Sequence, residues 1–257
     1  MYSVRIEKDS ISHRGDRLTT MVCSYPRLIH SEMMTHRMMS RNSSSSRAIP
    51  VSKMIEQVRS DPVIPIFTAA QKGMQGGVLD EGIVKAAEVE WLEARNDAVK
   101  RAQNLLSRNV HKQNANRLLE PFSWITVIIT ATEWSNFFAQ RVNSNAQPEI
   151  YKIALMMYEA YRQSTPVSTS KHMPFITAED TLANIPPTLL RKIAVARCAR
   201  VSYLTHDGKR DPEADLNLYE HLYAEGHWSP FEHVADAVAG QYANFDGWKS
   251  YRYQVSK

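Results

Sequence analysis

The chain has very little cysteine, and this scarcity excludes two kinds of site. Its 257 residues include only Cys23 and Cys198, which are far apart and form no CxxC pair. Two isolated cysteines cannot build the disulfide framework of a small secreted domain or a thiolate zinc site. We therefore expect a protein of the reducing cytoplasm.

Long apolar runs are also missing. The opening residues, MYSVRIEKDS, are too polar for a signal peptide, and no stretch approaches the roughly 20 apolar residues that cross a bilayer. The net charge is only +4. That charge suits anionic ligands but is too small to indicate a nucleic-acid surface, so we expect neither a membrane nor a nucleic acid as partner.

The common nucleotide and metal motifs are absent. No GxGxxG or Walker sequence occurs, and the GMQGG stretch at 73–77 lacks the required spacing. The segment His227–His233, HWSPFEH, has two histidines and a glutamate, which invites a metal interpretation. The spacing differs from that of an HExxH zinc helix, and Pro230 breaks any helical face. We expect no metal; the segment is more typical of an aromatic turn that packs on a ring ligand.

The composition is that of an average globular protein. Apolar residues make up 43% and charged residues 23%, which is enough for a packed core. Short apolar or β-branched runs at 3–7 and 18–24 predict strands. Helical spacing or proline and cap signals predict helices over 26–36, 91–106, 132–141, 147–162, 189–202 and from Pro212 to Gly226. We predict one α+β domain over residues 1–257.

Local signals refine three of these segments. Asn145 is the predicted N-cap of the 147–162 helix, and Asp211 that of the helix that begins at Pro212. The segment Trp248–Tyr253 alternates aromatic and basic residues. It suits either nucleobase stacking or a strand with an aromatic face.

The most polar segment is THRMMSRNSSSSRAIP, residues 35–50. His36, Arg37 and Arg47 flank four consecutive serines, Ser43–Ser46. Guanidinium groups match phosphate oxygens, and hydroxyl groups add neutral donors. From these residues alone, a phosphate site and a plain surface loop are both open. A serine nucleophile would need a base and an orienting group, which the nearness of His36 in sequence does not supply.

A second polar group lies on the helix predicted over 132–141. Asn136 and Gln140 are one turn apart and share a face with each other. Arg141 follows two phenylalanines, and an arginine beside aromatic residues is commonly a solvated residue with a packed stem. It becomes a functional candidate only if this face points into a pocket.

Four blocks together resemble the flavin-dependent thymidylate synthases. The family signature is similar to RHRxxSxNxxSxR, and residues 35–47 read THRMMSRNSSSSR, so every position except Thr35 matches. The remaining blocks are NRLLEP at 116–121, NFFAQR with AQPEI within 136–150, and ARVS at 199–202 with GHWSPFEH at 226–233.

The order of these blocks differs from the order in the family, where ARVS and GHxxPFEH precede the RHR block. The resemblance therefore implies a circularly permuted form of the family's α+β fold, in which helices flank an antiparallel sheet. Permutation costs little where the chain ends lie close together. We accordingly predict that Met1 and Lys257 lie on the same side of the fold.

The resemblance implies an enzyme, a methyltransferase that converts dUMP to dTMP. FAD reduced by NADPH would supply reducing equivalents, and methylene-tetrahydrofolate would supply the one-carbon unit. The resemblance also implies a homotetramer with active sites shared between chains. Partner chains would then cover the polar loop.

The resemblance also assigns roles to individual residues. Arg141 matches the arginine that polarises the uracil and stabilises charge at N3 and O2, so it is the expected catalytic residue. The residues expected to bind the nucleotide are Glu32, Ser43, Ser44, Ser45, Ser46, Arg47, Arg117 and Arg141. The residues expected to bind the flavin are Thr35, His36, Arg37, Ser43, Thr130, Thr132, Asn136, His227 and Ser229.

Several positions depart from the family pattern. Thr35 replaces an arginine, Ser43 replaces a glutamate, and Thr130 and Thr132 stand where the family often has Asn and Arg. Glu32 stands where an amide often touches the nucleotide, and a glutamate can accept a hydrogen bond from a cytosine amine. A related change at C5, such as hydroxymethylation, is therefore an alternative. A non-catalytic nucleotide- or nucleic-acid-binding protein is another.

Overall fold

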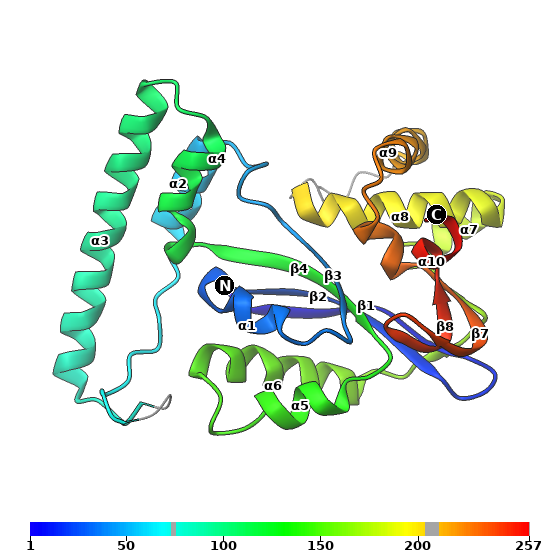
Figure 1. Ribbon diagram of the computed structural model, residues 1–257, viewed down its shortest axis with the longest axis horizontal. Coiled ribbons are helices and arrows are strands. Elements are labelled where there is room, and N and C mark those ends of the chain that lie inside the picture. The colour runs from blue at the N-terminus through cyan, green and yellow to red at the C-terminus, as the bar shows by residue number, and fades with distance from the viewer. Residues whose placement is uncertain (73–75, 204–210, 257) are drawn as a thin grey trace.

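A five-stranded sheet forms the middle of the structure, a computed structural model that describes residues 1–72, 76–203 and 211–256 (Figure 1). The strand order is β3-β4-β2-β1-β5, and all neighbours are antiparallel except β1 and β5. The strands are β1 (Ser3–Ile11), β2 (Arg17–Pro26), β3 (Ser40–Ser43), β4 (Trp124–Ala131) and β5 (Val167–Ser168).

Helices cover both faces of this sheet, and others form an arm beside it (Figure 1). The α-helices are α1 (His30–Met34), α2 (Val51–Ser60), α3 (Glu81–Ser107), α4 (Lys112–Ala115), α5 (Ser135–Arg141), α6 (Pro148–Gln163), α7 (Ala178–Leu182), α8 (Pro187–Tyr203), α9 (Pro212–Ala224) and α10 (Tyr251–Val255). Shorter 3-10 turns are η1 (Arg27–Ile29), η2 (Asn116–Leu118), η3 (Glu120–Phe122) and η4 (Ser229–His233). This arrangement confirms the predicted α+β class.

Strand β4 is buried on both faces because most residues of its sequence, WITVIITA, are apolar. In β4, Val127 packs with α5 and α6, whereas the next residue, Ile128, packs with Cys198 of α8. Neighbouring residues of a strand point to opposite faces, so a continuous apolar run requires cover on both sides. The sheet is therefore the middle layer of three.

A smaller sheet has the order β6-β7-β8 and is made of β6 (Lys171–His172), β7 (Ala235–Tyr242) and β8 (Phe245–Ser250). Fully buried Trp248 packs with Leu18 of β2, which fastens the small sheet to the large one. The aromatic segment 248–253 is divided between two elements. Ser250 ends β8, and its hydroxyl accepts a hydrogen bond from the backbone of Tyr253 at the start of α10.

The structure confirms some predicted helix ends and corrects others. Asp211 caps α9 as predicted, because its carboxylate accepts from the backbone of Ala214 at 3.0 Å. The prediction of Asn145 as a cap was wrong: Gln147 holds the N-cap position of α6. The prediction of a helix from Pro26 was also wrong at its start. Pro26 pairs with Trp124 in the sheet, and the α-helix begins at His30.

The predicted circular permutation is not confirmed. The amino group of Met1 forms an ion pair with Asp61, just after α2, whereas α10 near the other end packs on η4, β7 and β8. The N and C labels lie apart in Figure 1. Lys257 itself lies outside the described residues.

Among residues 1–72, 76–203 and 211–256, none of the helices combines the length and the apolar character needed to cross a bilayer.

Candidate functional site

The serine run alternates between two kinds of environment. Ser44 and Ser46 are only 2% exposed. Ser43, which precedes them, and Ser45, which lies between them, are partly exposed. The hydroxyl of Ser46 donates to Glu120 at 2.5 Å, and the backbone of Ser44 donates to the carbonyl of Thr126 at 3.0 Å. The buried pair therefore anchors the segment on β4 and η3, and the open pair is left free for contacts outside.

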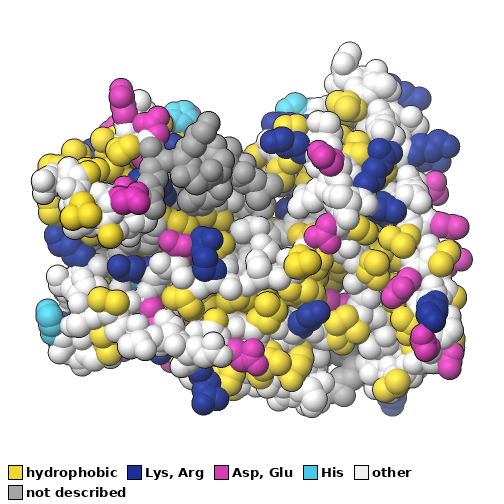
Figure 2. All heavy atoms as spheres, turned by 180° about the vertical axis from the view of Figure 1, so that it is seen from behind, with side chains coloured by type: hydrophobic (Ala, Val, Ile, Leu, Met, Phe, Trp, Pro, Cys, Tyr) yellow, Lys and Arg dark blue, Asp and Glu magenta, His cyan; other side chains and the backbone are white. Residues whose placement is uncertain are grey.

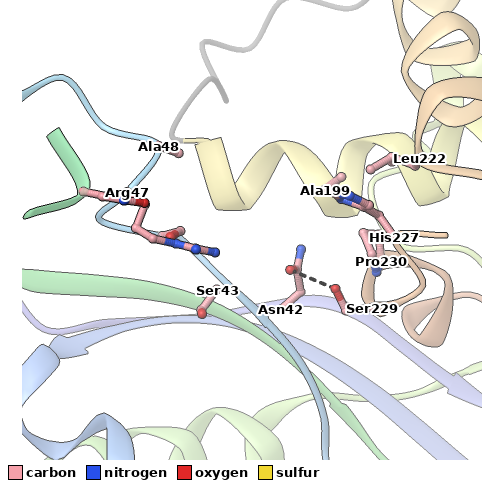
Figure 3. A pocket seen from close by; sticks show the side chains of 11 residues that line it. Asn42, Ser43, Arg47, Ala48, Ala199, Leu222, His227, Ser229 and Pro230 are labelled. Carbon is pink, nitrogen blue, oxygen red and sulfur yellow. Dashed lines mark hydrogen bonds between the residues drawn. The ribbon is translucent and has the colours of Figure 1, made fainter. Parts of the chain in front are cut away.

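The open serines line a cavity of about 490 Å³ that separate parts of the chain enclose. Its lining residues are Asn42, Ser43, Ser45, Arg47, Ala48, Gln113, Ala199, Leu222, His227, Ser229 and Pro230. Arg47 extends toward the cavity from one side, and His227 and Ser229 face it from the other (Figure 3). Figure 2 shows the surface hollowed between the block of α8 and α9 and the block of α2 to α4.

The cavity lining combines one arginine with neutral polar side chains. Among the described residues Arg47 forms no ion pair, so its guanidinium is available to a ligand. The ring of His227 lies 3.2 Å from the carboxylate of Glu225. The hydroxyl of Ser229 donates to the side-chain oxygen of Asn42 at 3.4 Å, which joins η4 to β3. A ligand that carries a phosphate and a further polar group could bind here, with the phosphate at the guanidinium and the polar group at the neutral side chains.

Arg141 belongs to a second cluster, outside this cavity. Its Nε donates to Nε2 of His36 at 2.8 Å, and its Nη2 donates to the hydroxyl of Thr35 at 3.3 Å. Burial, with the charges of Arg141 and Arg41, lowers the pKa of His36 to about 4. The ring is therefore neutral near pH 7, and the bond from Arg141 places its proton on Nδ1. Phe137 packs against the same ring edge to face, at 4.9 Å between centroids.

Other predicted residues near this cluster lie at the surface. Arg37 is exposed, and Asn136 is exposed on α5, where its backbone donates to Glu133. Glu32 lies on α1, and its carboxylate accepts from the hydroxyl of Ser31 at 2.9 Å. The structure thus places Glu32, Thr35, His36, Arg37, Asn136 and Arg141 apart from the cavity lining.

Three predicted residues already have partners within the chain. Arg117 pairs with Glu120 at 3.0 Å and does not line the cavity. The hydroxyl of Thr132 accepts from the backbone of Asp246 at 3.1 Å. Thr130 is fully buried and bonded to two other side chains, which leaves it no open face toward a cofactor.

Some cavity residues are absent from the set predicted by sequence. Asn42 occupies the Asn of the signature, so that signal was present. Gln113 and Leu222 carry no local signal, because they come from α4 and α9 and reach the cavity only through the fold. Ala48, Ala199 and Pro230 complete the lining as small or apolar walls.

The comparison with protein families decides the classification. The model of the family described as thymidylate synthase complementing protein matches residues 17–167, more than half of the chain. The chain belongs to this family. The match confirms the resemblance to flavin-dependent thymidylate synthases and contains β2 to β4, α5, α6 and the serine run. Residues 168–257 lie outside it, so it does not test the order of the last blocks.

Solved structures with a similar fold include PolB of Streptomyces cacaoi, a UMP/dUMP methylase bound with 5-Br UMP. It is 15% identical, with a TM-score of 0.51, over 63% of this chain and 89% of PolB. The structure of the same protein with 5-Br dUMP is 18% identical, with a TM-score of 0.45, over 57% and 66% of the two chains. The first likeness shows that the two chains share a fold. No curated protein matches the chain.

Proposed function

We propose that this protein is a flavin-dependent enzyme that methylates C5 of dUMP, or of a closely related pyrimidine nucleotide, with methylene-tetrahydrofolate as one-carbon donor. Membership of the thymidylate synthase complementing family supports an enzyme of the thymidylate synthase type. The observation that carries the proposal is the cavity in which Ser43, Ser45 and Arg47 stand open while the serines between them anchor the segment.

In this proposal the nucleotide phosphate binds to Arg47 and the open serines. A guanidinium presents parallel donors that suit phosphate oxygens, and the hydroxyls of Ser43 and Ser45 add uncharged donors beside it. Arg47 has no competing carboxylate among the described residues, so binding does not require an ion pair to break. The cavity volume of about 490 Å³ lies within the range of small-ligand sites.

Arg141 is proposed to stabilise the negative charge that develops on the pyrimidine ring when C5 acts as nucleophile. A fixed cation at developing charge lowers the barrier because it needs no reorganisation during the reaction. Neutral His36 orients this guanidinium by accepting a hydrogen bond from its Nε–H, and the exposed Thr35 hydroxyl is the partner of its Nη2. Arg141 is outside the cavity of its own chain, so a second copy would bring the two clusters together. This supports the proposed homotetramer with shared active sites.

The polar groups on the η4 side of the cavity fit a flavin cofactor. His227 and Ser229 line the cavity there, and Ser229 is bonded to Asn42. Hydroxyl, amide and imidazole groups suit the edges and phosphates of FAD. When bound, FAD reduced by NADPH would supply the electrons that convert a transferred methylene group into methyl. In the same proposal, Thr35, His36, Arg37 and Asn136 contact the cofactor from a neighbouring copy.

The identity of the pyrimidine is a further part of the proposal. PolB is described as a UMP/dUMP methylase, so both ribose forms belong in the assay. Glu32 offers a carboxylate on the Arg141 side that suits a cytosine amine. Hydroxymethylation of dCMP is therefore the second candidate.

The proposed phosphate site can be tested by measuring dUMP binding, without any assay of catalytic turnover. We expect calorimetry to detect dUMP binding to the wild-type protein, and Arg47→Ala to weaken it roughly 30-fold, since hydrogen bonds to charged groups contribute about 1.5–3 kcal/mol. Arg101→Ala is the matched control, an exposed arginine on α3 away from the cavity. Equal affinities for all three proteins would refute the assignment of the phosphate site.

A further inference from the structure

A continuous chain of buried polar side chains runs through the interior from β1 to η4. Its members are Ser10, His172, Thr20, Thr130 and His233, all with no exposed surface. Hydrogen bonds join Ser10 Oγ to His172 Nδ1 at 2.9 Å and His172 Nε2 to Thr20 Oγ1 at 2.7 Å. Two more join Thr20 to Thr130 at 2.6 Å and Thr130 to Nδ1 of His233 at 2.8 Å.

Proton counting leaves this chain three arrangements when both rings are neutral. A threonine hydroxyl donates once, and a neutral imidazole has one N–H and one acceptor nitrogen. Two of the arrangements place the proton of His233 on Nδ1, with the proton of His172 on either nitrogen. The third places both protons on Nε2, and the bonds then run from Ser10 toward His233. A proton on Nδ1 of His172 together with one on Nε2 of His233 would leave the contact between Thr20 and Thr130 without a proton.

The free end of the chain shows which nitrogen of His233 carries the proton. Nε2 of His233 is buried and has no hydrogen-bond partner among the described residues. If it carried the proton, the chain would end in an orphaned buried N–H, which folded proteins avoid more strictly than an unused acceptor. A proton on Nδ1 of His233 leaves only an unused lone pair on Nε2, and is therefore the favoured position.

Both rings meet the condition of neutrality. Burial lowers the pKa of His233 to about 3, and burial with the charges of Lys8 and His233 lowers that of His172 well below its ordinary value. Thr130 joins the two halves of the chain, because its hydroxyl contacts both Thr20 and His233.

The far end of the chain belongs to the turn that lines the cavity. His233 is the last residue of η4, and Ser229 and Pro230 of the same turn are lining residues. η4 packs against β3, β4 and α8. The bond from His233 to Thr130 is its buried side-chain link to β4, while Ser229 makes a surface link to Asn42 of β3.

We propose that this hydrogen-bonded chain is a positioning device for the candidate cavity. It holds η4 on β4, with Thr130 and His233 as positioning residues and His233 protonated on Nδ1, so that its ring donates to Thr130. Its effect on ligand binding rests on the proposed function, whereas its proton arrangement and its hold on η4 do not. Thr130, which the family pattern suggested as a flavin contact, acts on the site through His233 instead.

Nuclear magnetic resonance of the nitrogen-labelled protein tests the proton arrangement without any ligand. We expect His233 in the wild-type protein to be neutral, with the proton on Nδ1. Thr130→Val should release His233 from that single tautomer, and Thr130→Ser should restore it. A proton on Nε2 of His233 in the wild-type protein would overturn the proposal.

Hydrogen exchange and binding test the positioning. The backbone amide of Phe231, bonded within η4, should exchange at least tenfold faster in Thr130→Val than in Thr130→Ser or in Thr19→Val. Thr19 is a matched control, a buried threonine on β2 whose hydroxyl bonds Asp9 instead of η4. Equal exchange in Thr130→Val and Thr19→Val would overturn the positioning role.

The affinity for dUMP should follow the same order, with a roughly tenfold loss in Thr130→Val and rescue in Thr130→Ser. Unchanged affinity in Thr130→Val would overturn the link to the cavity. Absence of dUMP binding in the wild-type protein would refute the proposed function instead, and the tautomer and exchange results would then decide the proposal by themselves.

Discussion

Adjacent serines of one short segment have opposite roles, and the difference comes from the contacts that each one makes. Ser44 bonds to Thr126 of β4 and Ser46 to Glu120 of η3, whereas Ser43 and Ser45 line the cavity. Only Ser43 belongs to β3, and Ser46 lies in the turn that follows it. Composition alone could not separate a loop from an anion site, because half of the serines are structural and half are open.

The buried serine should matter for stability and the open one for binding. We expect Ser46→Ala to lower the free energy of unfolding by about 1–3 kcal/mol, because it removes a hydrogen bond to Glu120 from a buried position. Ser45→Ala should leave stability nearly unchanged and weaken dUMP binding. Urea unfolding and calorimetry on both variants check this. A larger loss of stability in Ser45→Ala would contradict the assignment.

The buried arginine of α8 offers a second test at the scale of the residue. Arg197 is 5% exposed and pairs with Asp180 at 2.6 Å and with Asp215 at 2.8 Å, which joins α7 and α9 to α8. Removing one partner of a buried ion pair leaves an uncompensated charge. We expect Arg197→Met to cost about 3–5 kcal/mol in urea unfolding. Arg101→Met, at an exposed position of α3, is the control and should cost almost nothing.

At the scale of the element, the sequence correctly predicted a helix start that depends on contacts between residues close in sequence. Asp211 and Pro212 marked the start of α9 because a cap acts within one turn. The start of α1 was mispredicted because Pro26 is held by pairing with Trp124, almost a hundred positions away in sequence. Gln113 and Leu222 were not predicted as site residues because their positions also depend on contacts between residues far apart in sequence. Those residues reach the cavity only when α4 and α9 take their places on the fold.

The cap of α9 can be tested directly. Asp211→Ala should lower stability by about 1 kcal/mol, because it leaves the backbone N–H of Ala214 without its acceptor. Asp211→Ser should recover most of that loss, since serine also caps helices. Asp97→Ala, in the exposed middle of α3, controls for the loss of a carboxylate. Thermal unfolding of the three variants gives the comparison; an equal loss in Asp97→Ala would exclude the cap as the cause.

At the scale of the whole molecule, stability should fall on acidification. Burial is the largest cause that lowers the pKa of His30 and of His36 to about 4, from an ordinary 6.5. The unfolded chain then binds protons that the folded protein does not, so this contribution is complete above pH 6.5 and is lost as the pH falls toward 4. His30→Gln should flatten the dependence of the urea midpoint on pH between 6.5 and 4. Exposed His13→Gln is its control, and an unchanged slope in His30→Gln would contradict this account.

The separation of the two arginine clusters also belongs to the whole molecule. Arg47 lines the cavity, and Arg141 lies with His36 elsewhere on the same chain. If active sites combine them from different copies, Arg141→Ala should be inactive alone, and Arg47→Ala should be inactive alone at a dUMP concentration too low to fill its weakened site. Unfolded and refolded together in equal amounts, they should recover about a quarter of the activity, from the sites that receive both intact arginines. No recovery in mixtures that contain hybrid oligomers would contradict shared sites.

The central claim is nucleotide methylation, and product analysis tests it most directly. Purified protein is incubated with FAD, NADPH and methylene-tetrahydrofolate, with dUMP, UMP and dCMP in parallel tubes, and the nucleotides are analysed by mass spectrometry. We expect dUMP or UMP to gain the mass of one methylene unit, and Arg141→Ala to abolish the gain. A hydroxymethylated dCMP product, or no product from any nucleotide that binds, would contradict the account.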